Sequence, residues 1–160
     1  MLRSLRTRPV ALFALLTASG CDAVTSLGVA RDRDVEGIVV TLTVSSSVAE
    51  TGDEVRLTIA AHNATDQRIE LGGPCGPPLD AIITRPDGRR SSALLEMVGE
   101  DAVFTCELRE HHIADPGETE TMELVWRPPP QRGTYTVVGG VRATYREISN
   151  PSAPVHVVVR

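Results

Sequence analysis

The sequence predicts an all-β protein, an antiparallel β-sandwich of about seven to nine short strands. Several segments alternate apolar and polar residues with a period of two, as strands with one buried face do. Turns rich in Gly, Pro, Asn and Asp separate these segments at the spacing found in sandwiches. Residues 116–135 add a Pro-Gly turn, an apolar run that ends at the single tryptophan, Trp126, and a rigid triple proline. Together these observations favour a core enclosed by packed sheets.

The first twenty residues predict a secretory signal peptide. A basic start (Arg3, Arg6 and Arg8) precedes an apolar stretch, residues 10–16, that is too short to span a bilayer. The following Ala18-Ser19-Gly20-Cys21 resembles the lipobox of bacterial lipoproteins, whose cysteine is acylated and becomes the new N-terminus. Leucine is more frequent at the position of Ala18, and the alternative is an ordinary signal peptide with a cysteine nearby. We expect lipid attachment at Cys21, which anchors the protein to a membrane of the bacterial cell envelope, outside the cytoplasm.

The predicted organisation is a signal peptide (residues 1–20), a flexible tether (21–37) and a single β-sandwich domain (38–160). Removal of 20 residues from the 160-residue chain leaves 140, which is enough for one domain. Three of the 16 arginines leave with the signal peptide, so 13 remain against 21 acidic residues and the net charge is −8. This acidic balance argues against nucleic acid as a partner and against a second, electrostatic contact with the membrane.

The two remaining cysteines, Cys75 and Cys106, form an even pair in an exported chain. Because the compartments outside the cytoplasm are oxidising, we expect a disulfide between them. The alternative is two free buried thiols. A zinc site is disfavoured because neither cysteine has a CxxC partner.

From residue 38 onward the period-two pattern predicts the strands. The two clearest strands place the following apolar residues on one face: Val40, Leu42 and Val44, then Val55, Leu57, Ile59 and Ala61. Further strands are expected at residues 69–71, 80–85, 90–97, 103–108, 122–126, 133–135, 137–144 and 155–159. Turns are expected at residues 51–53, 63–66, 72–78, 86–88 and 116–117. Asn63-Ala64-Thr65 spells a glycosylation sequon, which we interpret as turn chemistry.

The stretch that ends at Trp126 is expected to anchor the core. Met122, Leu124 and Trp126 share one face of a strand, so Glu123 is expected to be exposed. We interpret residues 116–135 as two neighbouring strands joined by the triple proline. Tyr135 follows Gly133-Thr134 at the start of the second strand and is a candidate for a tyrosine corner, a structural hydrogen bond. Gly139-Gly140 within the following strand indicates a bulge or a close backbone contact.

Four motifs, in this order, resemble the BsuPI family of intracellular proteinase inhibitors. They are a strand that ends in Asn63, a hairpin turn at Pro86-Asp87-Gly88, Pro116-Gly117-Glu118 followed by the strand to Trp126, and Gly133-Thr134-Tyr135-Thr136-Val137. The resemblance covers most of residues 38–160 and implies an immunoglobulin-like β-sandwich. It also implies inhibition of a proteinase, although that activity belongs to the cytosol and this chain carries an export signal. The paired cysteines are likewise not required by the family name, so the fold transfers more safely than the activity.

The sequence predicts no enzyme, no cofactor and no metal site. Ser91, Ser92, His111, His112 and Asp115 supply the ingredients of a hydrolytic triad, but no nucleophile elbow or similar local signature surrounds them. Adjacent histidines on a strand point to opposite faces, which disfavours shared metal binding.

Binding of a protein partner is the remaining function. The candidate loops are residues 72–78 and residues 128–132, although the triple proline in the second is favoured as a simple connector. We therefore expect an envelope lipoprotein that docks an unknown protein; the alternative is a proteinase inhibitor that acts outside the cytoplasm. An inhibitor is expected to present a protruding, ordered loop, and a docking module a flat face or a sheet edge.

Overall fold

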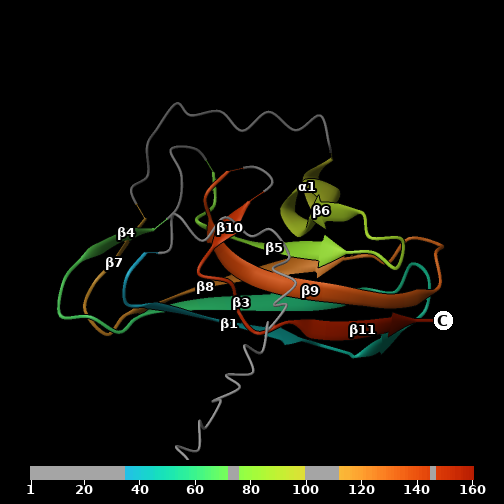
Figure 1. Cartoon of the computed structure of the whole chain (residues 1–160), viewed down its shortest axis with the longest axis horizontal. Helices are drawn as coiled ribbons and strands as arrows, with labels where there is room; N and C mark the ends of the chain where they lie inside the picture. Colours follow the sequence, from blue (N-terminus) through green and yellow to red (C-terminus); the bar gives the residue numbers. More distant parts are fainter. Residues whose placement is uncertain (1–34, 72–75, 100–111, 145–146) are drawn as a thin grey trace, which may run out of the picture.

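A computed structural model of the chain describes residues 35–71, 76–99, 112–144 and 147–160 (Figure 1). These ranges contain one helix, α1 (Ala93–Val98), and eleven strands. The strands are Ile38–Val44 (β1), Val48–Ala49 (β2), Val55–Asn63 (β3), Ile69–Leu71 (β4), Leu79–Thr84 (β5), Arg90–Ser92 (β6), His112–Ala114 (β7), Thr119–Trp126 (β8), Gly133–Arg142 (β9), Ile148–Ser149 (β10) and Val155–Val159 (β11). The count exceeds the expected seven to nine because β2 and β10 have two residues each.

The first sheet has the order β1-β3-β8 and is antiparallel throughout. Its register places Leu42 opposite Ile59, and Ile59 opposite Met122. Apolar residues at every second position of the three strands therefore lie on one face, as the alternation in the sequence predicts.

The second sheet has the order β2-β11-β9-β5-β6, with β10 beside β9. All of its pairs are antiparallel except β2 with β11. The first two strands of the chain thus belong to different sheets, β1 to the first and β2 to the second. A separate two-stranded sheet joins β4 to β7. This arrangement is an immunoglobulin-like β-sandwich, so the predicted fold class is confirmed.

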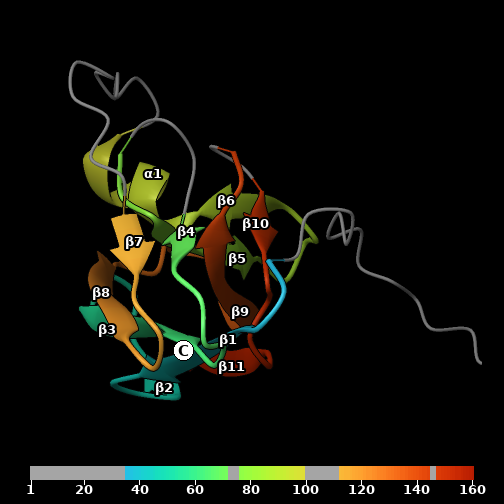
Figure 2. The ribbon, with the colours of Figure 1, turned by 90° about the vertical axis from the view of Figure 1, so that its left-hand side faces the viewer.

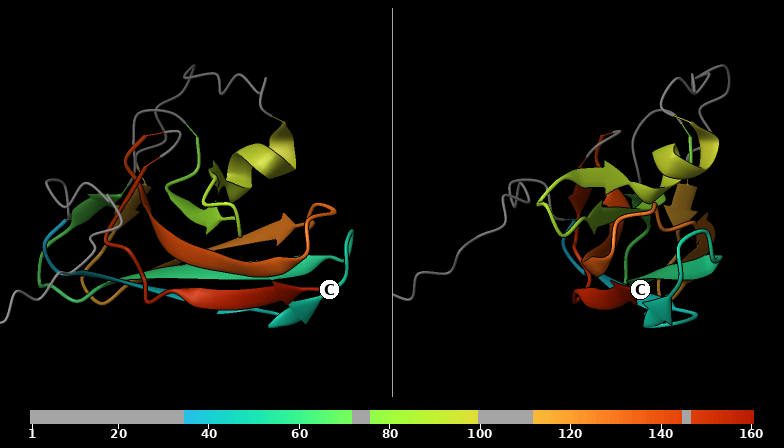
Figure 3. Two further views of the ribbon diagram at one scale, coloured as in Figure 1. Left: turned by 45° about the vertical axis from the view of Figure 1, so that its right-hand side comes forward. Right: turned by 90° about the vertical axis from the view of Figure 1, so that its right-hand side faces the viewer.

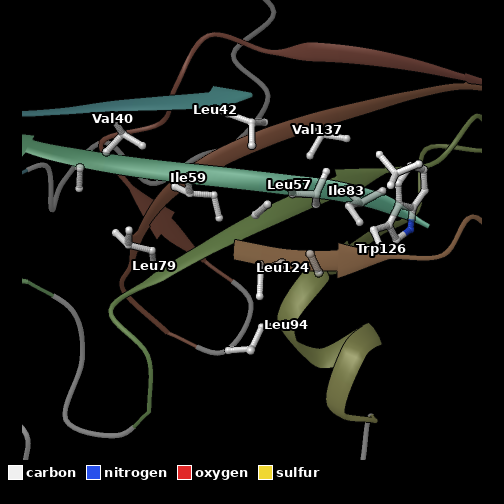
Figure 4. Packing of buried hydrophobic residues seen from close by; sticks show 14 of the residues in the cluster. Val40, Leu42, Leu57, Ile59, Leu79, Ile83, Leu94, Leu124, Trp126 and Val137 are labelled. Atoms are coloured by element: carbon white, nitrogen blue, oxygen red, sulfur yellow. The ribbon is translucent and has the colours of Figure 1, made fainter. Parts of the chain in front are cut away.

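The core lies where the two sheets face each other (Figure 4). Leu57, Ile59 and Leu124 from the first sheet and Ile83 and Val137 from the second are fully buried. Trp126 is 1% exposed, and its ring lies 5.2 Å from that of Tyr135 at an interplanar angle of 56°. Glu123 is exposed. The predicted orientation of this strand is confirmed.

The prediction that residues 116–135 form two neighbouring strands is only partly correct. Strands β8 and β9 follow each other along the chain but belong to opposite sheets, on opposite sides of the sandwich (Figure 2). The triple proline therefore connects the two sheets. Strand β9 also runs without interruption from Gly133 to Arg142, where the pattern had predicted two strands.

The expected strand over residues 90–97 is wrong beyond Ser92. Helix α1 begins there, because Ser92 caps it: its Oγ accepts a hydrogen bond from the Leu95 N–H at 3.0 Å. The residues that follow are mostly good helix formers. The helix lies beside the strands (Figure 3), and its buried Leu94 points toward Leu124 (Figure 4). It contacts both β5 and β8, so it covers one open side of the sandwich.

Three local predictions are confirmed. The Tyr135 hydroxyl donates to the Gln131 carbonyl at 2.8 Å, which is a tyrosine corner. A Cβ on Gly140 would lie 2.7 Å from the Cβ of Ile148, so the glycine pair marks a close contact. The buried Asn63 side chain accepts from the Thr65 N–H at 3.0 Å and donates to the Ala114 carbonyl at 2.9 Å, so the sequon is turn chemistry.

Several predictions concern residues outside the described ranges. They include the signal peptide, lipid at Cys21, the Cys75–Cys106 disulfide, His111 and the expected strand 103–108. Within the described ranges, no helix combines the length and the apolar character needed to cross a membrane.

Candidate functional site

The proline loop, residues 128–132, connects β8 to β9 and is held in place by hydrogen bonds to its backbone carbonyls. Pro128 is buried, and its carbonyl accepts a hydrogen bond from the Gly52 N–H at 3.1 Å. The Gln131 carbonyl accepts the bond from Tyr135. The simpler interpretation of the triple proline is therefore supported. Of the other candidate loop, 72–78, the structure describes only residues 76–78, where the Pro78 carbonyl accepts from the Arg142 N–H at 2.8 Å.

Those candidate triad residues that the structure describes make other contacts. Ser91 Oγ donates to Glu96 Oε1 at 2.5 Å, and Ser92 Oγ donates to Asp80. Asp115 bonds to Arg68, whose guanidinium holds the pKa of this exposed carboxyl below its usual value. His112 lies on β7, paired with Leu71. Within the described residues, no group of three His, Cys, Asp or Glu side chains is placed to hold a metal ion.

The hairpin that joins β5 to β6, residues 85–91, is a further candidate binding site, and we call it the basic hairpin. The Gly88 N–H donates to the Arg85 carbonyl at 2.9 Å, and the Arg85 N–H donates to the Arg89 carbonyl at 2.8 Å. Gly88 has a φ of 83°, in the left-handed region. This is a three-residue hairpin loop closed by a glycine bulge, a conformation that glycine adopts without strain. Its tip, residues 86–90, is exposed.

The basic hairpin is braced from two directions. Glu96 of α1 accepts hydrogen bonds from both ends of the hairpin, from Arg85 at 2.9 Å and from Ser91 at 2.5 Å. On another side, Gly133 lies against Pro86, since a Cβ on Gly133 would come within 2.6 Å of Pro86 Cγ. The hairpin is therefore held in one conformation by α1 and by the start of β9.

The hairpin is locally basic within an acidic chain of net charge −5. Arg85 is paired with Glu96, and Arg89 Nε lies 3.5 Å from Asp87 Oδ2. Arg90 is exposed and forms no ion pair with any part of the chain that the structure describes. It also opens β6, the edge strand of the second sheet.

A buried polar group supports the base of this site. Asp80 of β5 is 1% exposed and accepts from the Leu94 N–H at 3.1 Å and from the Ala81 N–H at 2.7 Å, in addition to Ser92 Oγ. Burial raises the pKa of Asp80, while these hydrogen bonds and the charge of Arg142 oppose the rise. Asp80 thereby ties the start of α1 to the sheet.

Sequence reasoning missed Glu96 and Asp80, because residues 90–97 were assigned to a strand. A signal was present: Ser92 precedes Ala-Leu-Leu-Glu-Met, a run of strong helix formers after a good N-cap residue.

The outer face of the first sheet is the second candidate surface. Its outward residues on β1, β3 and β8 are mainly small and uncharged, including Thr41, Thr43, Thr58, Ala60 and Thr121. Charges gather toward one end, where Arg56 pairs with Glu123 at 3.2 Å and Arg127 pairs with Glu54. A shallow hollow there is lined by Ser45, Glu54, Arg56 and Val125.

A family model described as intracellular proteinase inhibitor, BsuPI, matches residues 42–145. The chain belongs to the BsuPI family. The match includes all of β3, β8 and β9, the end of β1 from Leu42 to Val44, and the whole basic hairpin. The comparison with curated proteins gives no match.

Solved structures of similar shape share little sequence with this chain. The β-glucosidase EmGH1 of Erythrobacter marinus has a TM-score of 0.50 at 10% identity, over 77% of this chain and 15% of that one. The alkylpurine DNA glycosylase AlkC of Pseudomonas fluorescens gives 0.49 at 11%, over 78% and 30%. The CARDB domain of PF1109 from Pyrococcus furiosus gives 0.45 at 14%, over 80% and 93%. This chain thus spans less than a third of the first two proteins, and the likeness to the β-glucosidase concerns the fold alone.

Proposed function

We propose that this chain is a non-enzymatic lipoprotein of the bacterial cell envelope whose BsuPI domain binds another protein. The observation that carries the proposal is the basic hairpin, which is exposed at its tip and braced at its base before any partner arrives. A loop that is already ordered loses little conformational entropy on binding, so more of its contact energy contributes to affinity. The lipobox-like sequence at Cys21 supports the location.

A narrower candidate is a proteinase inhibitor that acts outside the cytoplasm. Membership of the BsuPI family supports it, and so does the form of the hairpin, since a protruding, ordered loop is what an inhibitor presents. The outer face of the first sheet supports the broader alternative, a docking module without inhibitory activity.

Cross-linking in intact envelopes tests the broader proposal. Chains with Arg89→Ala and Arg90→Ala are compared with the natural sequence and with Arg56→Ala, a matched arginine on the other sheet. We expect cross-linked complexes to weaken in the two hairpin variants and to persist in Arg56→Ala. Identical complexes from all four chains would exclude the hairpin as the binding surface.

The location is tested by fractionation. If Cys21 carries lipid, Cys21→Ala releases the protein from membranes; a variant that stays in the membrane after signal cleavage contradicts the anchor.

The disulfide is tested by mass spectrometry without reduction. A Cys75–Cys106 bond makes the protein about two hydrogens lighter, and alkylation of both thiols in envelope-purified protein contradicts it.

A further inference from the structure

We propose that the basic hairpin is a substrate-like loop for a serine proteinase that selects arginine, and that Arg90 is the residue that enters its specificity pocket. The inference rests on the narrower function proposed above, the proteinase inhibitor, and names the class of its target.

The three arginine side chains of the hairpin differ in their partners. Arg85 is committed to Glu96 in the brace, and Arg89 lies beside Asp87 within the turn. Arg90 is exposed and unpaired within the described residues. A guanidinium in this position matches a narrow pocket with a carboxylate at its base, the type of pocket by which some serine proteinases select basic residues.

The direction of the hairpin backbone also favours Arg90. The Arg85 N–H donates to the Arg89 carbonyl, and antiparallel pairs alternate between bonded and non-bonded. The next bonded pair is therefore Ile83 with Ser91, and the pair between them, Thr84 with Arg90, is non-bonded. Hence the N–H and C=O of Arg90 point away from β5, outward from an edge strand. Extended peptides bind partners in this way, by adding a strand to an open edge.

The bond between Arg90 and Ser91 is the one that the proteinase attacks. A proteinase serine that attacks the Arg90 carbonyl carbon forms an ester, while the bond to the Ser91 nitrogen breaks and that nitrogen takes a proton from the enzyme's general acid. The Ser91 side of the break remains attached to the fold through its pairing with Ile83 and through its bond to Glu96. The amine therefore stays beside the ester, returns the proton to the enzyme, re-forms the peptide bond and frees the serine. Net cleavage is slow for this reason, and the loop inhibits.

The test uses the full chain purified from the envelope and three enzymes: trypsin, which cleaves after basic residues, chymotrypsin and subtilisin. We expect inhibition of trypsin alone. Arg90→Ala is expected to weaken it at least ~30-fold, the factor of a hot-spot contact. Arg68→Ala, an exposed arginine on the turn between β3 and β4, is expected to change it by no more than about twofold.

A second variant reports on the brace without altering the tip. Glu96→Ala frees both sides of the hairpin, so trypsin is expected to cleave the Arg90–Ser91 bond faster, as seen by mass spectrometry of the fragments. Cleavage no faster than in the natural chain overturns the role of the brace.

The remaining outcomes distinguish a failure of this inference from a failure of the proposed inhibitor function. Inhibition of subtilisin or chymotrypsin that survives Arg90→Ala overturns the arginine-selective loop and leaves a proteinase inhibitor. No inhibition of any of the three enzymes also overturns it, whereas hairpin-dependent cross-links would still support a protein-binding module.

Discussion

The proline loop and the basic hairpin lie at the same end of the sandwich, where Gly133, just after the proline loop, lies against Pro86 of the hairpin. The two segments are nevertheless ordered in different ways. The proline loop is held by its backbone, whose carbonyls at Pro128 and Gln131 are bonded to Gly52 and Tyr135. The hairpin is held near its base by side chains that converge on Glu96, and its tip remains exposed. The comparison shows that proline content by itself is a poor guide to a binding loop. The proline-rich segment is a structural connector, and the hairpin with the exposed tip is the segment available to a partner.

The largest expected effect comes from the residue that leads into the proline loop. Trp126→Ala removes a fully buried ring and is expected to cost about 3–5 kcal/mol of stability in a denaturant titration. Glu123→Ala on the exposed face of the same strand is the control, with a change within roughly 0.5 kcal/mol. Small and equal effects would mean that Trp126 is not part of the core.

The contact between the start of β9 and the hairpin is tested at Gly133. A Cβ there meets Pro86 at 2.6 Å, and φ is 138°, so Gly133→Ala is expected to cost about 1–3 kcal/mol. Gly52→Ala is the matched control, because Gly52 also has a positive φ but its Cβ would meet nothing within 4 Å. If both variants lose the same stability, the Pro86 contact contributes nothing to the support of the hairpin.

The fastening of the proline loop is tested at Tyr135. Tyr135→Phe keeps the buried ring and removes the hydroxyl that bonds to the Gln131 carbonyl, for an expected cost of about 0.5–1.5 kcal/mol. Thermal unfolding measures this loss, and limited proteolysis shows whether residues 128–132 become easier to cleave. Unchanged stability together with unchanged cleavage would contradict the tyrosine corner as a fastening.

The smallest expected effect is a pH dependence of the folding stability, which arises from Asp80 at the base of the hairpin. Burial holds the pKa of Asp80 above the ordinary 3.8, so the folded state binds this proton more tightly than the unfolded state. The stabilising contribution is complete below pH 3.8 and is lost as the pH rises through the raised value. We expect Asp80→Asn to remove this part of the slope in denaturant midpoints measured across that range. Parallel pH profiles for the two proteins would show that Asp80 does not titrate in this way.

Much of the fold could be predicted because each prediction depended on near neighbours in the sequence. The alternation around Trp126 sets which side chains face inward, and Asn63 forms its turn with Thr65, two residues away. Tyr135 bonds only four residues back along the chain. Membership of the BsuPI family was recognised on the order of such local motifs.

The candidate site was harder to predict because its contacts join distant segments. By position, residues 90–97 could form the partner strand of a hairpin. The carboxylate of Asp80, fourteen residues before Leu94, instead accepts a hydrogen bond from the Leu94 N–H in the first turn of a helix there. Glu96 then reaches back eleven residues to Arg85 and converts a turn into a braced loop.

The sequence by itself determined the β-sandwich class, the inward face of its strands and the local hydrogen bonds of its turns, because these follow from side-chain periodicity and short-range bonding. Only the tertiary structure decided that β8 and β9 separate into opposite sheets and that α1 braces the basic hairpin. Those outcomes depend on how whole elements pack and which distant polar groups are buried together, and no local pattern records that.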